Sequence, residues 1–316
     1  MRKGFTVWLS VLGMLGFGII LSSFLAKDTA EADNVLSVVT SFNANYEITM
    51  PPIPNDLEFC MEKVPLDEWE VKERIEREML SNTYWQSNTV LLIKRSGRFF
   101  DVMERILAEE GVPQDFKYLA VTESGLLQTV SPAGARGIWQ FMPPTAKTYG
   151  LEVNDEVDER YHVEKSTRAA CQYLKHAKEE LGSWTLAAAA YNRGVNGILR
   201  DLKKQRVENY YDLYLNTETS RYIFRILAFK LIMENPRRYG FIITDEELYN
   251  PIEEQVVTVD KTIEDLAEYA QFHGTNYKTI KLLNPWLRSN SLTISEGQSY
   301  QITLPAHRRS PLPQNR

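Results

Sequence analysis

The stretch that decides the fold class is STRAACQYLKHAKEELG, residues 166–182. Its apolar side chains recur at spacings of four, three and four residues: Ala170, Leu174, Ala177 and Leu181. This period places them on one face of a helix that packs against a core. Ser166 or Thr167 is expected to cap the start of this helix, because a hydroxyl there can accept a hydrogen bond from a free backbone N–H.

The same helical pattern extends on both sides of this stretch, from about residue 57 to residue 235. Ser183 can cap a following helix, and the small side chains of residues 187–190 allow a neighbouring helix to approach closely. A further apolar stripe precedes Pro236, which ends it: Phe224, Leu227, Ala228 and Leu231. Residues 57–250 are therefore predicted to form one mainly α domain.

The pattern changes after Pro251, where β-branched residues become common. Two strands and two short helices are predicted within residues 251–306, in the order 255–259, 262–272, 276–283 and 300–304. A unit of this size buries little apolar surface, so a binding module of α+β class is expected rather than a second enzyme. Residues 307–316 form a tail.

The N-terminus carries an export signature. Arg2 and Lys3 precede the uncharged run 5–26, and Ala30-Glu31-Ala32 has the small residues of a cleavage site. The run of 22 residues is also long enough to span a bilayer. Residues 1–32 are therefore predicted to be either a removed signal peptide or a membrane anchor, and both readings place the rest outside the cytoplasm. Residues 33–56, rich in Ser, Thr, Asn and Pro, are interpreted as a tether.

Composition argues against several classes of function. The 316 residues include 36 basic and 42 acidic side chains, and the net charge of −6 argues against nucleic acid as a partner. Two cysteines, Cys60 and Cys171, are too few for a disulfide scaffold, although one bridge between them stays open. No nucleotide-binding fingerprint or metal-ligand spacing is found, so we expect neither a metal nor a cofactor.

Glu123 is the strongest candidate for chemistry. It follows the apolar segment 118–121 and precedes Gly125, so its carboxyl is expected where a buried segment meets a polar loop. Burial disfavours the charged form of a carboxylic acid and raises its pKa, which would let Glu123 donate a proton near neutral pH. From the local sequence alone, a glutamate before a glycine is more often an ordinary charge at a helix end.

Four short motifs follow one another along the helical domain: ESG at 123–125, GIWQFMP at 137–143 with Thr145, AYNRG at 190–194, and Glu218-Thr219 with Tyr222. Together they resemble the ordered motifs of the soluble-lytic-transglycosylase-type catalytic domain, most closely in its membrane-bound D type. Four motifs in one order are far more specific than any one of them.

The resemblance implies a lysozyme-like helical fold of the goose type, a glycan strand of bacterial peptidoglycan as substrate and no cofactor. It implies that Glu123 is the sole catalytic acid. The remaining matched positions are implied to bind substrate: Ser131, Gln140, Met142, Tyr191, Asn192, Glu218 and Tyr222. Among them, Tyr191 and Ser131 are expected to orient or stabilise the reacting groups.

The chemistry implied by this resemblance is cleavage of the β-1,4 bond between N-acetylmuramic acid and N-acetylglucosamine. Protonated Glu123 would donate to the glycosidic oxygen while the 2-acetamido oxygen of the sugar attacks the anomeric carbon, so no carboxylate nucleophile is needed. Ionised Glu123 would then remove the proton of the C6 hydroxyl, which closes a 1,6-anhydro ring in place of attack by water.

Two alternatives remain open at this stage. A muramidase that hydrolyses the same bond needs a second carboxylate about 6.5–9.5 Å from the acid to activate water. The candidates for that role are Glu152, Asp155, Glu156, Asp158, Glu159 and Glu218. The first five form a charge run, which is interpreted as a solvated face. The other alternative is a catalytically silent scaffold that binds peptidoglycan.

The C-terminal module resembles a LysM domain. Leu283-Asn284-Pro285 and Gly297-Gln298 fit that family, whereas residues 259–263 depart from its usual Gly-Asp-Thr-Leu turn. The resemblance implies glycan binding near residues 260–262 and 284–286, and a merely structural cap remains the alternative. Residues 5–26 would also allow membrane association. The expected location is the periplasm of a Gram-negative bacterium, with the chain soluble or anchored to the inner membrane.

Overall fold

The computed structural model describes residues 48–306, and from Pro51 onward they form one compact unit. The predicted signal peptide or anchor, most of the tether and the tail lie outside the described residues. Within the described range, no helix has the length and apolar character needed to cross a membrane. Pro51 is buried, and the Pro52 carbonyl accepts a hydrogen bond from the Tyr239 hydroxyl at 3.1 Å.

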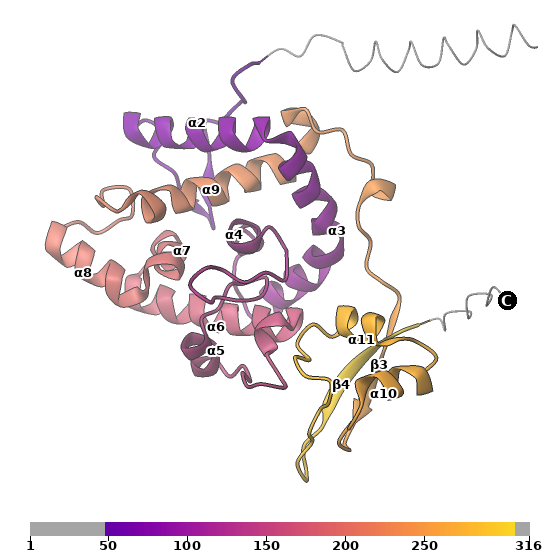
Figure 1. Ribbon diagram of the computed structural model, residues 1–316. Coiled ribbons are helices and arrows are strands. Elements are labelled where there is room, and N and C mark those ends of the chain that lie inside the picture. Colours follow the sequence, from indigo (N-terminus) through magenta and orange to yellow (C-terminus); the bar gives the residue numbers. More distant parts are fainter. Residues whose placement is uncertain (1–47, 307–316) are drawn as a thin grey trace, which may run out of the picture. The chain divides into compact units, whose positions relative to one another are not determined.

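The first part of the described chain is mainly α, as predicted (Figure 1). A short hairpin, β1 and β2, precedes the helices. The elements are β1 (Glu58–Phe59), β2 (Glu62–Lys63), α2 (Trp69–Tyr84), α3 (Gln86–Glu109), α4 (Phe116–Ser124), α5 (Pro143–Thr148), η1 (Glu159–Tyr161), α6 (Val163–Leu181), α7 (Trp184–Arg193), α8 (Val195–Gln205), α9 (Thr217–Glu234), η2 (Pro236–Tyr239) and η3 (Asp245–Glu247).

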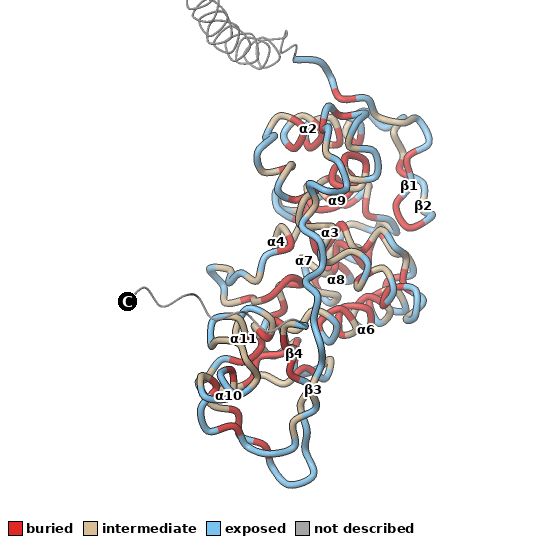
Figure 2. Tube along the Cα trace, turned by 90° about the vertical axis from the view of Figure 1, so that its right-hand side faces the viewer, coloured by how far each residue is buried: buried red, intermediate tan, exposed pale blue. Residues whose placement is uncertain are grey.

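Helix α4 lies among the other helices of this part and packs against α3 and α9 (Figure 1). Phe116, Leu119 and Ala120 are fully buried, so α4 is surrounded by core on most of its circumference. Helix α9 is buried almost all round, as the red stretches of the tube in Figure 2 show. These contacts hold the C-terminal end of α4 in a fixed position.

The apolar stripe of α6 is confirmed, because Ala170, Leu174 and Ala177 have no exposed surface. The predicted cap of this helix is wrong. The helix begins at Val163, and the His162 ring nitrogen Nδ1 accepts from the Lys165 N–H. Ser166 and Thr167 lie inside the first turns, where their hydroxyls donate to the carbonyls of His162 and Val163 at 2.7 Å each. A hydroxyl inside a helix can donate to a preceding carbonyl in this way. Sequence alone does not distinguish such a hydroxyl from one that caps the helix.

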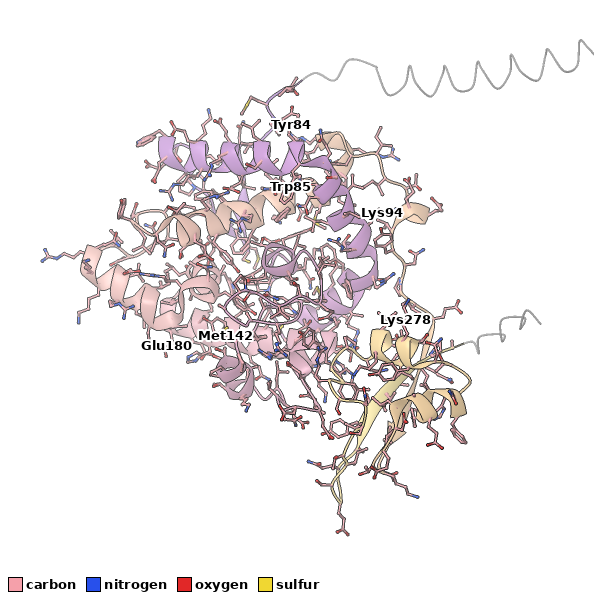
Figure 3. All side chains as sticks on the ribbon, in the orientation of Figure 1. Tyr84, Trp85, Lys94, Met142, Glu180 and Lys278 are labelled. Carbon is pink, nitrogen blue, oxygen red and sulfur yellow. The ribbon has the colours of Figure 1, made fainter. Side chains whose placement is uncertain are left out.

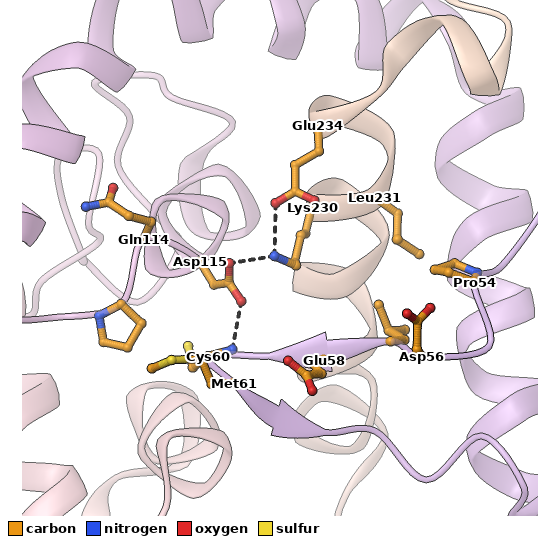
Figure 4. Close-up of a pocket in the computed structure, with 12 residues that line it drawn as sticks. Pro54, Asp56, Glu58, Cys60, Met61, Gln114, Asp115, Lys230, Leu231 and Glu234 are labelled. Carbon is orange, nitrogen blue, oxygen red and sulfur yellow. Dashed lines mark hydrogen bonds and ion pairs between the residues drawn. The ribbon is translucent and has the colours of Figure 1, made fainter.

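Both cysteines are buried and free, so no bridge joins them. Burial raises the pKa of the Cys171 thiol to about 12, as expected for a small hydrophobic core residue. Cys60 and Met61 form the turn of the β1–β2 hairpin, both with positive φ. The Cys60 N–H donates to the Asp115 carboxylate at 2.7 Å, and the ammonium of Lys230 bridges Asp115 and Glu234 (Figure 4). The hairpin is thereby joined to α9.

The C-terminal module has the predicted β-α-α-β order: β3 (Glu254–Val259), α10 (Leu266–Phe272), α11 (Tyr277–Leu283) and β4 (Tyr300–Pro305). The two strands are antiparallel, with Val257 opposite Ile302. Helix α10 begins later than expected, because the Asp265 carboxylate caps it by accepting from the N–H groups of residues 267 and 268. Ile263 instead pairs with Leu292 in a β-bridge.

The two segments expected to bind glycan in this module differ in exposure. Residues 260–262 are exposed, whereas Asn284 and Trp286 are buried. The Asn284 side chain bonds to the backbone of Ile280 and Thr303, and Trp286 stacks on Tyr300 with ring centroids 5.7 Å apart. These two side chains therefore support the module from inside.

Candidate active site

Glu123 lies in the last turn of α4, and Gly125 ends this helix in the left-handed conformation with φ of 61°. The apolar residues 118–121 are buried, and the Glu123 side chain follows them where the helix ends. Burial of the carboxyl raises the pKa of Glu123 to about 7. A carboxylic acid in this state can hold a proton at neutral pH.

The Tyr222 side chain, from α9, contacts this acid directly. Its hydroxyl donates a hydrogen bond to Oε1 of Glu123, which favours the ionised form and partly offsets the effect of burial on the pKa. The negative charge of Glu218 raises the pKa of Glu123 further, and the positive charge of Arg225 lowers it. Three residues spaced along α9 therefore set the protonation of one residue on α4.

Tyr191 was expected to orient the reacting groups, and its hydroxyl has a different partner. It donates to the backbone carbonyl of Trp139 at 2.8 Å. Its ring packs against Phe141 and Tyr173, with centroids 5.9 Å and 5.1 Å away. Tyr191 thus fixes the backbone of residues 139–141, and Tyr222 is the tyrosine bonded to the acid.

Asn192 and Glu218, from two different motifs, contact each other directly. The Asn192 amide nitrogen donates to Glu218 Oε1 at 3.0 Å, and the amide oxygen accepts from the Thr219 hydroxyl at 2.8 Å. Asn216 caps α9 by accepting from the Thr219 N–H at 2.9 Å. The two bonds of Asn192, near the end of α7, hold the start of α9 beside it. The side chain of Asn192 therefore has a fixed orientation.

Residues 129–142, here called the groove loop, carry the three remaining predicted residues. The Ser131 hydroxyl accepts from the Ala135 N–H at 3.0 Å. The amide nitrogen of Gln140 donates to the Gly137 carbonyl at 2.7 Å, and Gln140 adopts a positive φ of 51°. Met142 is 41% exposed at the start of α5 (Figure 3). The loop thus presents one polar and one apolar side chain at its C-terminal end.

The groove loop is held by a buried ion pair that the sequence did not reveal. Asp158 and Arg160 are 1% and 2% exposed, and two hydrogen bonds of 2.8 Å and 2.7 Å join them. The Arg160 guanidinium also donates to the backbone carbonyls of Phe141 at 3.1 Å and Gly134 at 3.3 Å. Its fork of donors therefore binds both ends of one turn of the groove loop.

Gly137 is required at this place. Its φ is 79°, and a Cβ atom there would lie 1.8 Å from the Arg160 carbonyl oxygen. No side chain fits such a distance, so the groove loop passes directly over the backbone of η1. The glycine of the GIWQFMP motif could have indicated that two backbone segments approach closely. It could not have indicated that the second segment is η1.

The acidic run at residues 152–159 is not the solvated face that was predicted. Asp155 is exposed, but Asp158 and Glu159 are buried. Glu159 binds the Lys165 ammonium and accepts from the Glu152 N–H at 2.8 Å. We call residues 152–161 the docking loop, because its remaining carboxylates, Glu152 and Glu156, bond to residues of the C-terminal module.

Metal binding has no obvious site in the described part of the chain. Between residues 48 and 306, no cluster of three or more His, Cys, Asp or Glu side chains is placed to hold an ion.

Comparison with known proteins identifies both parts of the chain. Residues 102–213 match the model of the Transglycosylase SLT domain, a range that contains Glu123, the groove loop and Asn192. This region is similar to the transglycosylase SLT domain family. Residues 255–308 match the soluble lytic transglycosylase C-terminal LysM-like domain. The mainly α domain followed by a LysM-like module, as expected from the sequence, is therefore confirmed.

Several individual proteins are similar to parts of the chain. The membrane-bound lytic murein transglycosylase D of Escherichia coli (strain K12) is 28% identical over 209 residues, which are 61% of this chain and 44% of the relative. A protein of Alteromonas sp. (strain M-1) named for tributyltin chloride resistance is 36% identical over 67 residues, 21% of this chain and 32% of its own. The chain thus spans less than half the length of these relatives.

Among solved structures, the 70 kDa soluble lytic transglycosylase of Escherichia coli shares 17% identity with this chain. The match covers 67% of this chain and 42% of that one, with a TM-score of 0.40.

The structure brings most of the predicted site residues into two groups. Tyr222 lies against Glu123, with Glu218 and Asn192 bonded to each other beside it, and the groove loop holds Ser131, Gln140 and Met142. Sequence reasoning missed Tyr173, Arg225 and the Asp158–Arg160 pair, and it assigned no role to Thr219 of the last motif. No motif signals Tyr173, Arg225 or the pair, because their contacts join segments that are distant in sequence.

Proposed function

We propose that this chain is a peptidoglycan lytic transglycosylase. It cleaves the β-1,4 bond between N-acetylmuramic acid and N-acetylglucosamine and forms 1,6-anhydro-N-acetylmuramic acid, in remodelling of the cell wall. The observation that supports this most strongly is the Glu123 carboxyl, whose pKa burial raises to about 7 while the Tyr222 hydroxyl holds one of its oxygens. The SLT family match over residues 102–213, which include Glu123, supports it independently.

In the first step, Glu123 acts as the acid. At neutral pH, a pKa of about 7 leaves roughly half of the Glu123 carboxyls protonated. Tyr222 donates to Oε1, so Oε2 is the oxygen that carries the transferable proton. The proton passes to the glycosidic oxygen as the bond to the anomeric carbon breaks, and the 2-acetamido oxygen of the muramic sugar forms a new bond to that carbon.

In the second step, the ionised Glu123 acts as the base. It takes the proton of the muramic C6 hydroxyl, whose oxygen displaces the acetamido oxygen and closes the 1,6-anhydro ring. Glu123 ends the cycle protonated, as it began. The hydrogen bond from Tyr222 stabilises the carboxylate between the two steps, and a group whose pKa is close to the working pH can serve in both directions.

The groove loop and the Asn192 pair are proposed to hold the sugars. The Gln140 amide nitrogen is already bonded to the groove loop, which leaves its amide oxygen to accept from a sugar hydroxyl or acetamido N–H. Met142 offers an exposed apolar surface for a sugar face. Ser131, Tyr191 and Glu218 complete this set through the backbone and side-chain bonds already described.

The hydrolytic alternative needs a second carboxylate placed to activate water. Glu218 is the carboxylate whose charge acts on the pKa of Glu123, and its Oε1 accepts from Asn192. Four of the five candidates in the acidic run have partners of their own: Glu152, Glu156, Asp158 and Glu159. These engagements favour ring closure by the sugar hydroxyl.

A silent scaffold is also less favoured, because such a protein has no need of a buried carboxyl with a raised pKa. We propose that the partner of both domains is the peptidoglycan glycan strand and that the chain works in the periplasm of a Gram-negative bacterium. It would be soluble there or anchored to the inner membrane through residues 5–26. The transglycosylase D relative is named as membrane-bound, which supports the envelope location.

The test is mass spectrometry of the muropeptides that the purified protein releases from sacculi. The expected product carries 1,6-anhydro-muramic acid, and Glu123→Gln should release none while still pelleting with sacculi. A digest that contains only reducing-end muramic acid would show a hydrolase. Equal release by the wild type and Glu123→Gln would remove Glu123 from the mechanism.

A further inference from the structure

The C-terminal module binds the docking loop through a set of polar contacts centred on Glu156. The Glu156 carboxylate accepts from the Thr293 N–H at 2.8 Å, and from the hydroxyls of Thr293 and Ser291 at 3.2 Å each. The backbone carbonyl of Glu156 accepts from the Arg288 N–H at 2.7 Å. At the other end of this contact, the Tyr300 hydroxyl donates to the Glu152 carboxylate at 3.0 Å.

Apolar packing continues the same contact. Val157 and Tyr161 of the docking loop are buried in the hydrophobic core of the module, not in that of the helical domain. Val157 pairs with Leu287 in a β-bridge, and the Arg288 guanidinium lies 4.5 Å from the centre of the Tyr161 ring. The Asp158 N–H donates to the Trp286 carbonyl at 2.8 Å. The docking loop is thus part of the module's own core.

The opposite side of the docking loop holds the groove loop. The Asp158 carboxylate fixes Arg160, which donates to the carbonyls of Gly134 and Phe141, and it also accepts from the Arg136 guanidinium of the groove loop at 3.4 Å. The Gln128 amide nitrogen donates to the Tyr161 carbonyl at 2.9 Å. One short segment therefore contacts the module with one set of atoms and the groove loop with another.

We propose that the C-terminal module is a positioning element for the substrate groove. It fixes the docking loop, the docking loop fixes Arg160, and Arg160 fixes the backbone that carries Ser131, Gln140 and Met142. The consequence for turnover rests on the proposed function, whereas the mechanical coupling does not. This role differs from glycan tethering, in which a module raises the local concentration of polymer and leaves the groove unchanged.

The sharpest perturbation is Glu156→Ala, which removes three acceptor contacts to the module and touches no residue of the groove loop. Glu180→Ala is the matched control, because Glu180 is an exposed carboxylate on α6 that makes no hydrogen bond or ion pair within residues 48–306 (Figure 3). Glu156→Gln keeps an oxygen that can accept from the Thr293 N–H and should restore much of the effect.

Hydrogen exchange measures the coupling without any need for activity. In Glu156→Ala, the backbone amides of the groove loop should exchange about ten-fold faster, because the charge-assisted contacts of Glu156 no longer oppose local opening. The Glu180→Ala variant should match the wild type. If Glu156→Ala does not fold, Thr293→Val removes one hydroxyl contact from the side of the module and should act in the same direction with a smaller effect.

Turnover of a soluble four-sugar glycan fragment tests the functional consequence. A displaced groove should raise KM for this fragment about threefold or more in Glu156→Ala, while the pH dependence set by Glu123 stays unchanged. If Glu156→Ala has the wild-type KM on the fragment and loses activity only on sacculi, the module acts as a tether, and the proposal is overturned. Unchanged exchange of the groove loop in a folded Glu156→Ala protein would overturn it equally. Faster exchange in a chain that cleaves no glycan would uphold the coupling and refute the proposed function instead.

Discussion

Replacing Tyr222 by phenylalanine should move the pKa of Glu123 upward. The change removes the hydroxyl that donates to Glu123 Oε1 and keeps the ring, which is 3% exposed in the core. A hydrogen bond to a charged group contributes about 1.5–3 kcal/mol, and one pKa unit corresponds to about 1.36 kcal/mol. Losing a donor that favours the ionised form therefore raises the pKa by about one to two units, from about 7.

The assay is the pH dependence of kcat/KM on a soluble glycan fragment. Glu123 must be protonated to donate, so activity falls as the pH rises through its pKa, and this alkaline limb should shift upward by about one unit or more in Tyr222→Phe. Tyr239→Phe is the control, because the Tyr239 hydroxyl donates to the Pro52 carbonyl and not to the acid. A limb that stays in place or moves to lower pH in Tyr222→Phe would refute the assignment.

Three further changes test the structure around the site. Burial raises the pKa of Glu123 to about 7, so the folded state binds this proton more tightly than the unfolded state, and stability falls as the pH rises from about 4.5 to 7. Glu123→Gln removes this loss. It should raise the free energy of unfolding by up to about 3 kcal/mol at pH 8 and by much less at pH 5, as measured by urea titration. Gly137→Ala should lower the melting temperature more than Gly134→Ala, since both glycines have positive φ but only Gly137 meets a carbonyl oxygen at 1.8 Å; equal losses would contradict the close approach. Arg160→Ala should lower the free energy of unfolding by about 3–5 kcal/mol, because buried Asp158 then keeps only its longer contact with Arg136, at 3.4 Å, and adding Asp158→Asn should recover part of that loss in a double-mutant cycle.

Helices were predictable where their signal is local. The spacing of Ala170, Leu174 and Ala177 fixes one face of α6 whatever the rest of the chain does, and the structure buries all three. Ser183 was expected to cap α7, and its hydroxyl accepts from the Leu186 N–H at 3.1 Å. Local preference failed at the start of α6, because a histidine ring can fill the same place as a hydroxyl.

The acidic run shows why the rest was not predictable. The partners of Glu156 lie at Ser291 and Thr293, more than 130 residues away, and no periodicity connects them. A run of charge beside a buried segment is therefore indistinguishable in sequence from an exposed face. The same limit applies to Tyr191 and Tyr222, since only the structure shows which hydroxyl reaches Glu123, 99 residues from Tyr222.

The order of the motifs predicted most residues of the candidate site, but it could not predict the contacts between them. Glu123 was a candidate acid because an apolar segment ends beside it. In the structure, burial of its carboxyl raises the pKa to about 7. The role of Arg160 depends on backbone carbonyls of another segment, which carry no mark in the sequence, and the bond between Thr219 and Asn192 joins two motifs whose contact the sequence does not reveal.

The central claim is that one carboxyl group serves as acid and then as base, with the sugar providing both nucleophiles. Digesting sacculi in water enriched in heavy oxygen, followed by mass spectrometry of the released muramic ends, tests it most directly. The account predicts anhydro products that carry no heavy oxygen, because water never attacks the anomeric carbon. Heavy oxygen at the reducing end of the wild-type products would show that water is the nucleophile and would contradict it.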